Sequence, residues 1–277
     1  MFDNSIDWSG VICYYWIMIG FLIRKTFYDL WDNLFRIVLI NIGFLAVTAI
    51  PVFLPRLAAL FINSPALDAG LISIGIIICS VYLSMAAHSL KTISDYGSFG
   101  FLDFFKSFKA AWPSGIVMGV FIVLLFILIS VVIPFYMSME SLFGFLLGMI
   151  VFWAIVFAVL SFQFYFTVCA RLSPNLKKAF KKCMLISVDN SGLAIFLLIH
   201  NFIGLLLSVF LAFVFPGPAG VLLYLDEAVR LRLLKYDWLE ANPNADRKKI
   251  PWDELLIEER DKTGTRTLKN LIFPWKD

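Results

Sequence analysis

The segment AAWPSGIVMGVFIVLLFILISVVIPFYMSM, residues 110–139, is followed after Glu140 by SLFGFLLGMIVFWAIVFAVLSFQFYFTVCA, residues 141–170. Neither stretch of 30 residues contains a charged residue or a histidine. A helix needs roughly 20 apolar residues to cross a hydrocarbon core of about 30 Å, so each stretch is long enough to cross once. Both should be helical because lipid offers no hydrogen-bond partners to a free backbone. We therefore predict a transmembrane hairpin.

The composition of the whole chain agrees with a multi-pass membrane protein. Of its 277 residues, 61% are hydrophobic and only 16% are charged, against about 25% charged in soluble domains. The four cysteines show neither a CxxC pattern nor a paired spacing, so we interpret them as packing thiols: Cys13, Cys79, Cys169 and Cys183.

Further apolar stretches complete an all-α bundle of about six spans. We expect spans at residues 37–54, 69–90 and 191–214, and a short sixth span that begins near Ala219 at the outer face. Residues 8–23 are uncharged but short, so they form either an interfacial helix or an extra crossing. The predicted parts are therefore an N-terminal segment, a bundle and a cytoplasmic tail, at residues 1–26, 27–237 and 238–277.

Two segments between spans have the pattern of helices that lie on a membrane surface. The first, residues 91–109, combines phenylalanines with lysines, which suits an anionic leaflet better than a nucleic acid. In the second, Ser173-Pro174 predicts the start of a helix at residues 175–188. Its predicted apolar stripe consists of Leu176, Phe180, Met184 and Leu185. We expect lipid or a partner protein to contact its lysines and the large apolar residues of the tail: Lys177, Lys178, Lys181, Lys182, Trp252, Phe273 and Trp275.

Basic residues fall on alternate connections between the predicted spans. The connections after spans two and four hold three and five Lys or Arg residues, and the segment from Arg230 onward holds eleven. The connections after spans one, three and five hold one, none and none. Because basic residues are enriched in cytoplasmic loops, the first group and the C-terminus are predicted to be cytoplasmic.

Two GxxxG patterns occur in the hairpin, at Gly115 and Gly119 and at Gly144 and Gly148. In antiparallel helices they lie at opposite membrane faces and cannot contact each other. Each should admit another helix, from the same chain or from a second copy, so a homo-oligomer through these faces is an alternative to internal packing.

Polar residues within apolar surroundings are the candidates for intramembrane function: His200, Asp226, Glu227 and Arg230. A helix that starts at the outer face near Ala219 would place Asp226 about 10 Å along its length, in hydrocarbon. Arg230 is four residues further on, the spacing of a helical ion pair, and His200 is a candidate neighbour. The alternative is a tilted or partly re-entrant helix whose charges reach the cytoplasmic interface.

Residues 27–236 resemble the YesL-like family of bacterial membrane proteins, a domain of unknown function. The resemblance consists of LFR at Leu34–Arg36 followed by IVLIN at Ile37–Asn41, FLDFFKSFK at Phe101–Lys109, and NLKKAF at Asn175–Phe180. It covers about three quarters of the chain and consists of patterns of residue type rather than a catalytic signature.

The chain departs from the family pattern in its longer start, in the loop near residues 65–67, and in the tail after Trp238. The resemblance implies a bacterial cytoplasmic membrane protein with an accessory role in carbohydrate uptake. It carries over no functional residue.

Motifs for chemistry are absent from the sequence. It contains no GxxxxGK[ST], HExxH, GxSxG or CxxC pattern, and Asp226 and Glu227 point about 100° apart on a helix. We therefore expect no enzyme, no cofactor and no metal. The favoured function is a non-catalytic accessory or scaffold membrane protein with a membrane-complex or cytosolic protein partner, and the resemblance points to a carbohydrate uptake system of the ABC type. The alternative is a small solute or lipid transporter that uses His200 and Asp226.

Overall fold

The computed structural model describes residues 8–62, 64–172, 175–247 and 250–264, with side chains from Trp16 onward. This part of the chain contains helices and no strand, which confirms the all-α class. The elements are α1 (Trp8–Asp32), α2 (Leu34–Ala59), α3 (Pro65–Ser94), α4 (Phe101–Lys106), α5 (Phe108–Ile127), the π-helix η1 (Leu128–Val132), α6 (Ile133–Met137), α7 (Leu142–Phe162), α8 (Tyr165–Arg171), α9 (Leu176–Asp189), α10 (Ser191–Phe210), α11 (Gly217–Ala241), α12 (Trp252–Leu255) and α13 (Ile257–Thr263).

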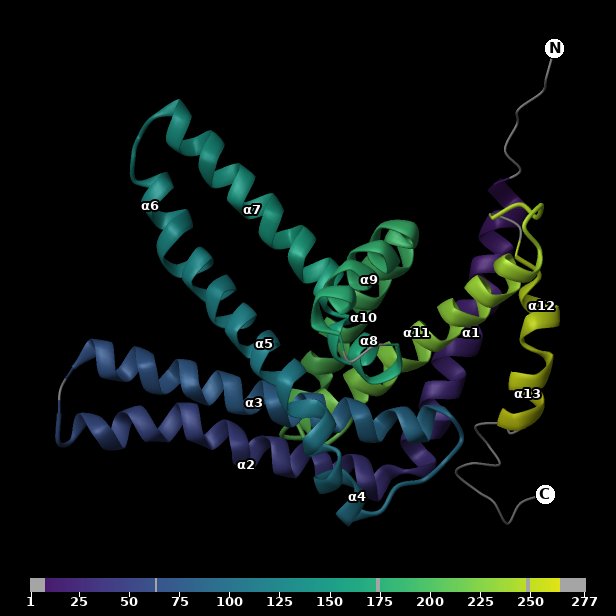
Figure 1. Ribbon diagram of the computed structural model, residues 1–277, viewed down its shortest axis with the longest axis horizontal. Coiled ribbons are helices and arrows are strands. Elements are labelled where there is room, and N and C mark those ends of the chain that lie inside the picture. The colour runs from purple at the N-terminus through teal and green to yellow at the C-terminus, as the bar shows by residue number, and fades with distance from the viewer. Residues whose placement is uncertain (1–7, 63, 173–174, 248–249, 265–277) are drawn as a thin grey trace. The chain divides into compact units, whose positions relative to one another are not determined.

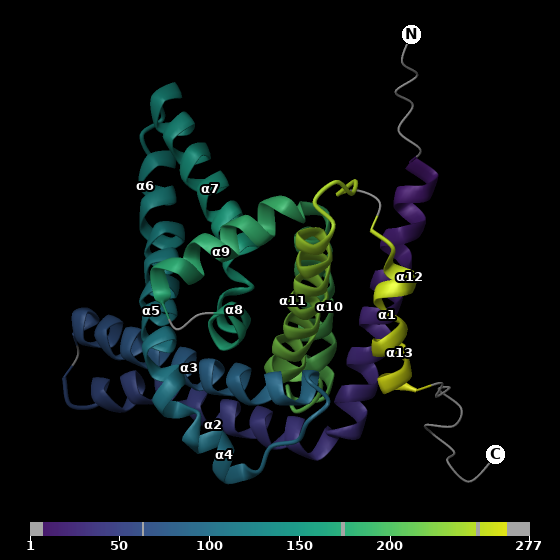
Figure 2. The same ribbon diagram turned by 45° about the vertical axis from the view of Figure 1, so that its right-hand side comes forward.

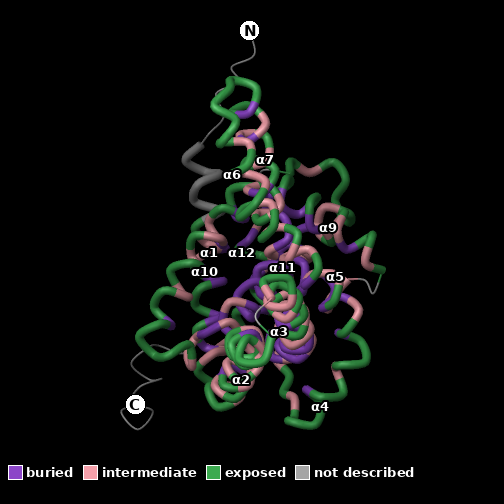
Figure 3. Tube along the Cα trace, turned by 90° about the vertical axis from the view of Figure 1, so that its left-hand side faces the viewer, coloured by how far each residue is buried: buried purple, intermediate pink, exposed green. Residues whose placement is uncertain are grey.

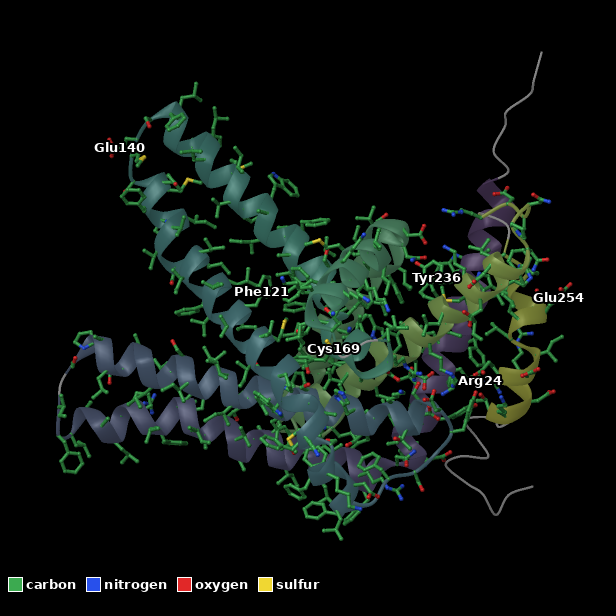
Figure 4. All side chains as sticks on the ribbon, viewed as in Figure 1. Arg24, Phe121, Glu140, Cys169, Tyr236 and Glu254 are labelled. Carbon is green, nitrogen blue, oxygen red and sulfur yellow. The ribbon has the colours of Figure 1, made fainter. Side chains whose placement is uncertain are left out.

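Five helical segments of the described chain are long and apolar enough to cross a membrane: Leu34–Ala59, Pro65–Ser94, Phe108–Met137, Leu142–Arg171 and Ser191–Phe210. The protein is therefore a multi-pass membrane protein. The predicted hairpin is confirmed as the third and fourth of these segments. Figure 4 shows Glu140 at the turn between them.

The predicted sixth span is not among these segments. Residues 217–241 do form one helix, α11, but Asp226, Glu227, Arg230 and Arg232 make it too polar to qualify. Residues 8–23 belong to the longer helix α1, which ends at Asp32 and is not among the five segments.

The chain divides into two compact units. One consists of the residues up to Asp32 and those from Glu227 onward, and the other of Asn33–Asp226. The division falls inside α11, between Asp226 and Glu227. The N-terminal segment and the tail, which the sequence presents as the two ends of the chain, thus share one unit.

In the unit of residues 33–226, α3 packs against both α2 and α5 (Figure 1). The contact with α5 depends on small residues. A Cβ atom added at Gly119 would lie 2.7 Å from the Cα atom of Ile77 on α3, and one at Gly115 would meet the backbone of Val81. The first GxxxG pattern thus admits an internal helix, as the packing alternative predicts.

The second GxxxG pattern is also covered from within the chain. A Cβ atom added at Gly144 would meet the carbonyl oxygen of Tyr136, and one at Gly148 would lie 2.9 Å from the Cε atom of Met137. Figure 3 shows exposed residues along the outer lengths of the hairpins, where lipid rather than protein is expected to cover apolar side chains.

Helix α9 packs against α7, α8 and α10 (Figure 2). Its buried face consists of Ala179, Cys183, Ile186 and Ser187. Two residues of the predicted apolar stripe lie outside this face, since Met184 and Leu185 are 40% and 58% exposed. The small residues of this face let α9 lie close to its neighbours, while Phe180 packs against the ring of Tyr165 at a centroid distance of 4.9 Å.

Candidate functional site

The start of α11 is fixed by Asn41, a wholly buried residue of α2. Its Oδ1 accepts a hydrogen bond from the backbone N–H of Ala219 at 2.9 Å, and its Nδ2 donates to the carbonyl oxygens of Val214 and Pro216 at 3.0 and 2.7 Å. Ser208 accepts from the N–H of Gly217 at 3.0 Å. The first N–H groups of a helix have no intrahelical acceptors, so these two side chains supply them.

The position of Asn41 shows where along α2 the first turn of α11 lies. Asn41 lies seven residues into α2, or about 10 Å along a helix about 39 Å long. The first turn of α11 is therefore held at the N-terminal third of α2. The full crossing and the re-entrant alternative both stay predictions.

Asp226 lies further along α11. It accepts hydrogen bonds from the guanidinium of Arg171, the last residue of α8. Nε of Arg171 lies 2.8 Å from Oδ1, and Nη2 contacts Oδ2. The same guanidinium donates to Asp95 Oδ1 at 2.9 Å and to Ser94 Oγ at 2.7 Å. The Asp226 side chain is 0% exposed and that of Arg171 is 7% exposed. A planar fork suits such two-point binding of a carboxylate.

These contacts show that the predicted pair of Asp226 with Arg230 is wrong. Spacing of i and i+4 permits such a pair, but both Asp226 oxygens are bound by Arg171. Arg230 instead donates to Glu259 of α13 at 2.7 Å. The reason is that Arg171 offers a fork already positioned by Asp95 and Ser94.

His200 is also not a neighbour of the carboxylate. Its ring stacks on that of Tyr224, with centroids 4.0 Å apart and planes 17° apart. Tyr224 and Asp226 are two residues apart on α11, and so point about 200° apart around the helix. The predicted candidates His200 and Asp226 thus belong to separate contacts.

Glu227 forms a second buried group of charges, in the other unit. Nζ of Lys25 on α1 contacts Glu227 Oε1, and it donates to Asp29 Oδ2 at 2.7 Å. The side chains of Lys25 and Glu227 are each 1% exposed. Burial raises the pKa of Glu227, and the nearby Asp29 raises it further, while Lys25 acts in the opposite direction.

The tail of the same unit is joined to α11 by Arg230 and Arg232. Glu259 accepts from Arg230, and the guanidinium of Arg232 lies 5.5 Å from the ring centroid of Trp252. Trp252 is 3% exposed, so its partner lies within this chain and the side chain is not open to lipid or another protein. Phe273 and Trp275 lie outside the described residues.

The four lysines predicted to contact lipid or a partner lie on α9. Lys177, Lys178 and Lys181 are exposed. Lys182 is less exposed and donates to the carbonyl oxygen of Leu172 at 3.4 Å.

The chain matches no protein-family profile, no curated protein and no solved structure. The resemblance to the YesL-like family therefore stays a prediction. Within the described residues no three His, Cys, Asp or Glu side chains gather as a metal site would require.

Sequence reasoning missed Arg171, Lys25 and Asn41 as partners of α11. Arg171 is 55 residues from Asp226, and Lys25 is 202 residues from Glu227. No local spacing relates them. The sequence does indicate that partners exist, because a buried charge needs one. It does not indicate which residue the partner is.

Proposed function

We propose that this protein is a non-catalytic accessory or scaffold component of a membrane complex. The observation that carries the proposal is the outer face of α9, defined here as Lys177, Lys178, Lys181, Met184, Leu185 and Val188. At 100° per residue these six positions fall within about 120° of the helix circumference. Leu185 and Val188 are 58% and 63% exposed, although α9 is not one of the five spans.

An exposed face that is basic at one end and apolar at the other suits a protein surface that offers carboxylates beside an apolar patch. The buried charges of α11 support the same conclusion, because each is paired with another side chain of this chain, as a purely structural role requires. Asp226 and Glu227 are held by Arg171 and Lys25. A solute pathway would instead need such groups to face a water-filled cavity.

Orientation and setting are part of the proposal. The basic connections before α5 and around α9 favour the cytoplasmic side of a bacterial inner membrane for both, together with the C-terminus. A partner of α9 would then be a cytosolic protein or the cytoplasmic part of a membrane complex. A carbohydrate uptake system of the ABC type is the partner that the YesL-like resemblance implies.

A pull-down from native membranes in mild detergent tests the proposal. A tagged wild-type chain should retain a stoichiometric partner, and Leu185→Asp should lose it while still reaching the membrane. Asp189→Asn, which changes another exposed residue of α9, is the control and should retain the partner. Solute flux into vesicles that contain this chain alone, with no partner retained, would contradict the proposal and favour a transporter.

A further inference from the structure

A cavity of about 480 Å3 lies between α2, α3 and the segment that contains α4, all within the unit of residues 33–226. Leu39, Ile40 and Ile42 of α2 form one wall, and Tyr82 of α3 forms another. We call it the aromatic pocket, because phenylalanines at 99, 101, 104 and 105 line the remaining side. Its volume is within the range of about 300–1,000 Å3 that is typical of ligand sites.

The walls of the aromatic pocket are held in place by packing and by a hydrogen bond. The Tyr82 hydroxyl donates to the carbonyl oxygen of Ile40 at 2.9 Å, and its ring lies 5.3 Å from that of Phe104. Phe104 is 5% exposed. Gly43 permits this approach, because an added Cβ atom there would collide with the Tyr82 hydroxyl. Tyr82 and Phe104 thus fix the inner wall of the pocket, while Phe35, Phe101 and Phe105 line its open side and are more than half exposed.

Arg36 is the charged residue that lines the aromatic pocket, which has no acidic residue in its lining. Its Nε donates to the carbonyl oxygen of Phe99 at 3.0 Å, and its Nη1 donates to Asn33 Oδ1 at 2.8 Å. Both partners are neutral and position the guanidinium. In the described part of the chain, Arg36 forms no ion pair with a carboxylate, and its Nη2 has no hydrogen-bond acceptor.

The place of Arg36 along the chain sets the kind of ligand. It is the third residue of the first span, where lipid headgroups are expected to meet the helix end. Lys106 of α4 is paired with Asp103 at 2.8 Å, so Arg36 is the cation that the pocket itself offers to a headgroup. A ligand here needs an apolar body to fill the aromatic pocket and an anionic head to meet Arg36.

We infer that the aromatic pocket binds one anionic phospholipid, with an acyl chain among the phenylalanines and the phosphate at Arg36. A phosphate oxygen is the preferred acceptor of a guanidinium, and a hydrocarbon chain suits walls that offer few polar atoms. This site is separate from the outer face of α9 and does not depend on the proposed function.

Native mass spectrometry of the detergent-purified protein tests the inference with phosphatidylglycerol and phosphatidylcholine of equal chain length. The wild-type protein should retain one phosphatidylglycerol in preference to phosphatidylcholine. Arg36→Gln should reduce that preference roughly tenfold, the loss expected for one hydrogen bond to a charged group. Arg56→Gln, at the far end of the same helix and exposed, is the matched control and should leave it unchanged.

A photoreactive phosphatidylglycerol with a diazirine at the chain end locates the bound chain independently. Labelling should concentrate on peptides that contain residues 39–43 and 99–105, and Leu39→Trp, which fills the pocket from a partly exposed position, should reduce it. Labels spread evenly over α5 and α7 would identify ordinary surrounding lipid and overturn the inference. Equal retention of both lipids by the wild-type protein would also overturn it, since the site would then not select an anionic headgroup.

Discussion

Arg171 and Asp226, 55 residues apart in the sequence, are joined by two hydrogen bonds from one guanidinium to one wholly buried carboxylate. Asp95 and Ser94 hold the same guanidinium from the end of α3. Three helices, α3, α8 and α11, are therefore connected through a single side chain. The cost of burying Asp226 is offset only while Arg171 is present.

The first prediction follows from that dependence. Arg171→Ala should destabilise the protein strongly, by about 3–5 kcal/mol, because it leaves the Asp226 carboxylate buried without a partner. Thermal unfolding in detergent measures the effect, with exposed Lys177→Ala as the control. The double variant Arg171→Met, Asp226→Leu should recover much of the loss, since it removes both charges. Equal unfolding temperatures for Arg171→Ala and Lys177→Ala would contradict the pairing.

The second prediction concerns Glu227, which lies outside the five spans. Burial raises its pKa above the ordinary value of 4.5, so the folded state retains a proton that the unfolded state has lost. The free energy of unfolding should therefore decrease as pH rises from about 4.5 through the raised pKa. Glu227→Gln should remove this part of the pH dependence, because the amide stays neutral. Melting curves recorded across that pH range give the unfolding free energy at each pH. Its decrease with rising pH should be smaller in the variant, and an equal decrease in both proteins would contradict the raised pKa of Glu227.

The third prediction concerns Trp252. Trp252→Ala removes a large buried side chain and the cation–π contact with Arg232, so it should cost about 3–5 kcal/mol in the unit that contains it. Limited proteolysis should then cut more rapidly around residues 242–264. Trp31→Ala is the control, because Trp31 is 42% exposed. Cleavage at the same rate in both variants would argue that the tail does not depend on this contact.

The fourth prediction concerns the contact of α5 with α3. Gly119→Val places a side chain against the backbone of Ile77, and overpacking of this kind typically costs about 1–3 kcal/mol. Gly204→Val on α10 is the control, since an added Cβ atom there has no neighbour within 4 Å. The difference in unfolding temperature measures the cost. If Gly119→Val changed the oligomeric state and left stability intact, the glycine would serve association of two copies instead.

The fifth prediction concerns membrane orientation. Cys183 in the basic connection is 0% exposed and burial raises the pKa of its thiol, so it should react poorly on either side of the membrane. Single cysteines at Lys178 and Glu140, both exposed, are better probes in a cysteine-free background. A membrane-impermeant maleimide should label the Glu140 position in intact cells and the Lys178 position only after permeabilisation. The reverse pattern would invert the proposed orientation.

The sequence by itself determined the membrane-spanning helices, because the length and apolarity of a segment are local properties that do not depend on the rest of the fold. The uncharged stretches on either side of Glu140 could form only long helices in lipid. The glycines at 115 and 119 likewise predicted a close helix contact, although not that α3 would supply it.

Only the tertiary structure decided which groups meet. The i, i+4 spacing of Asp226 and Arg230 offered a local pair, yet Asp226 binds Arg171 and Arg230 binds Glu259. The partner of a carboxylate is the cation that the packed helices bring within hydrogen-bond distance. The number of residues between the two groups in the sequence does not determine which cation this is. The same reason explains why α9 buries Ala179 and Cys183 while Met184 and Leu185 are exposed: small side chains let helices approach, and hydrophobicity alone does not report the distance of a neighbour.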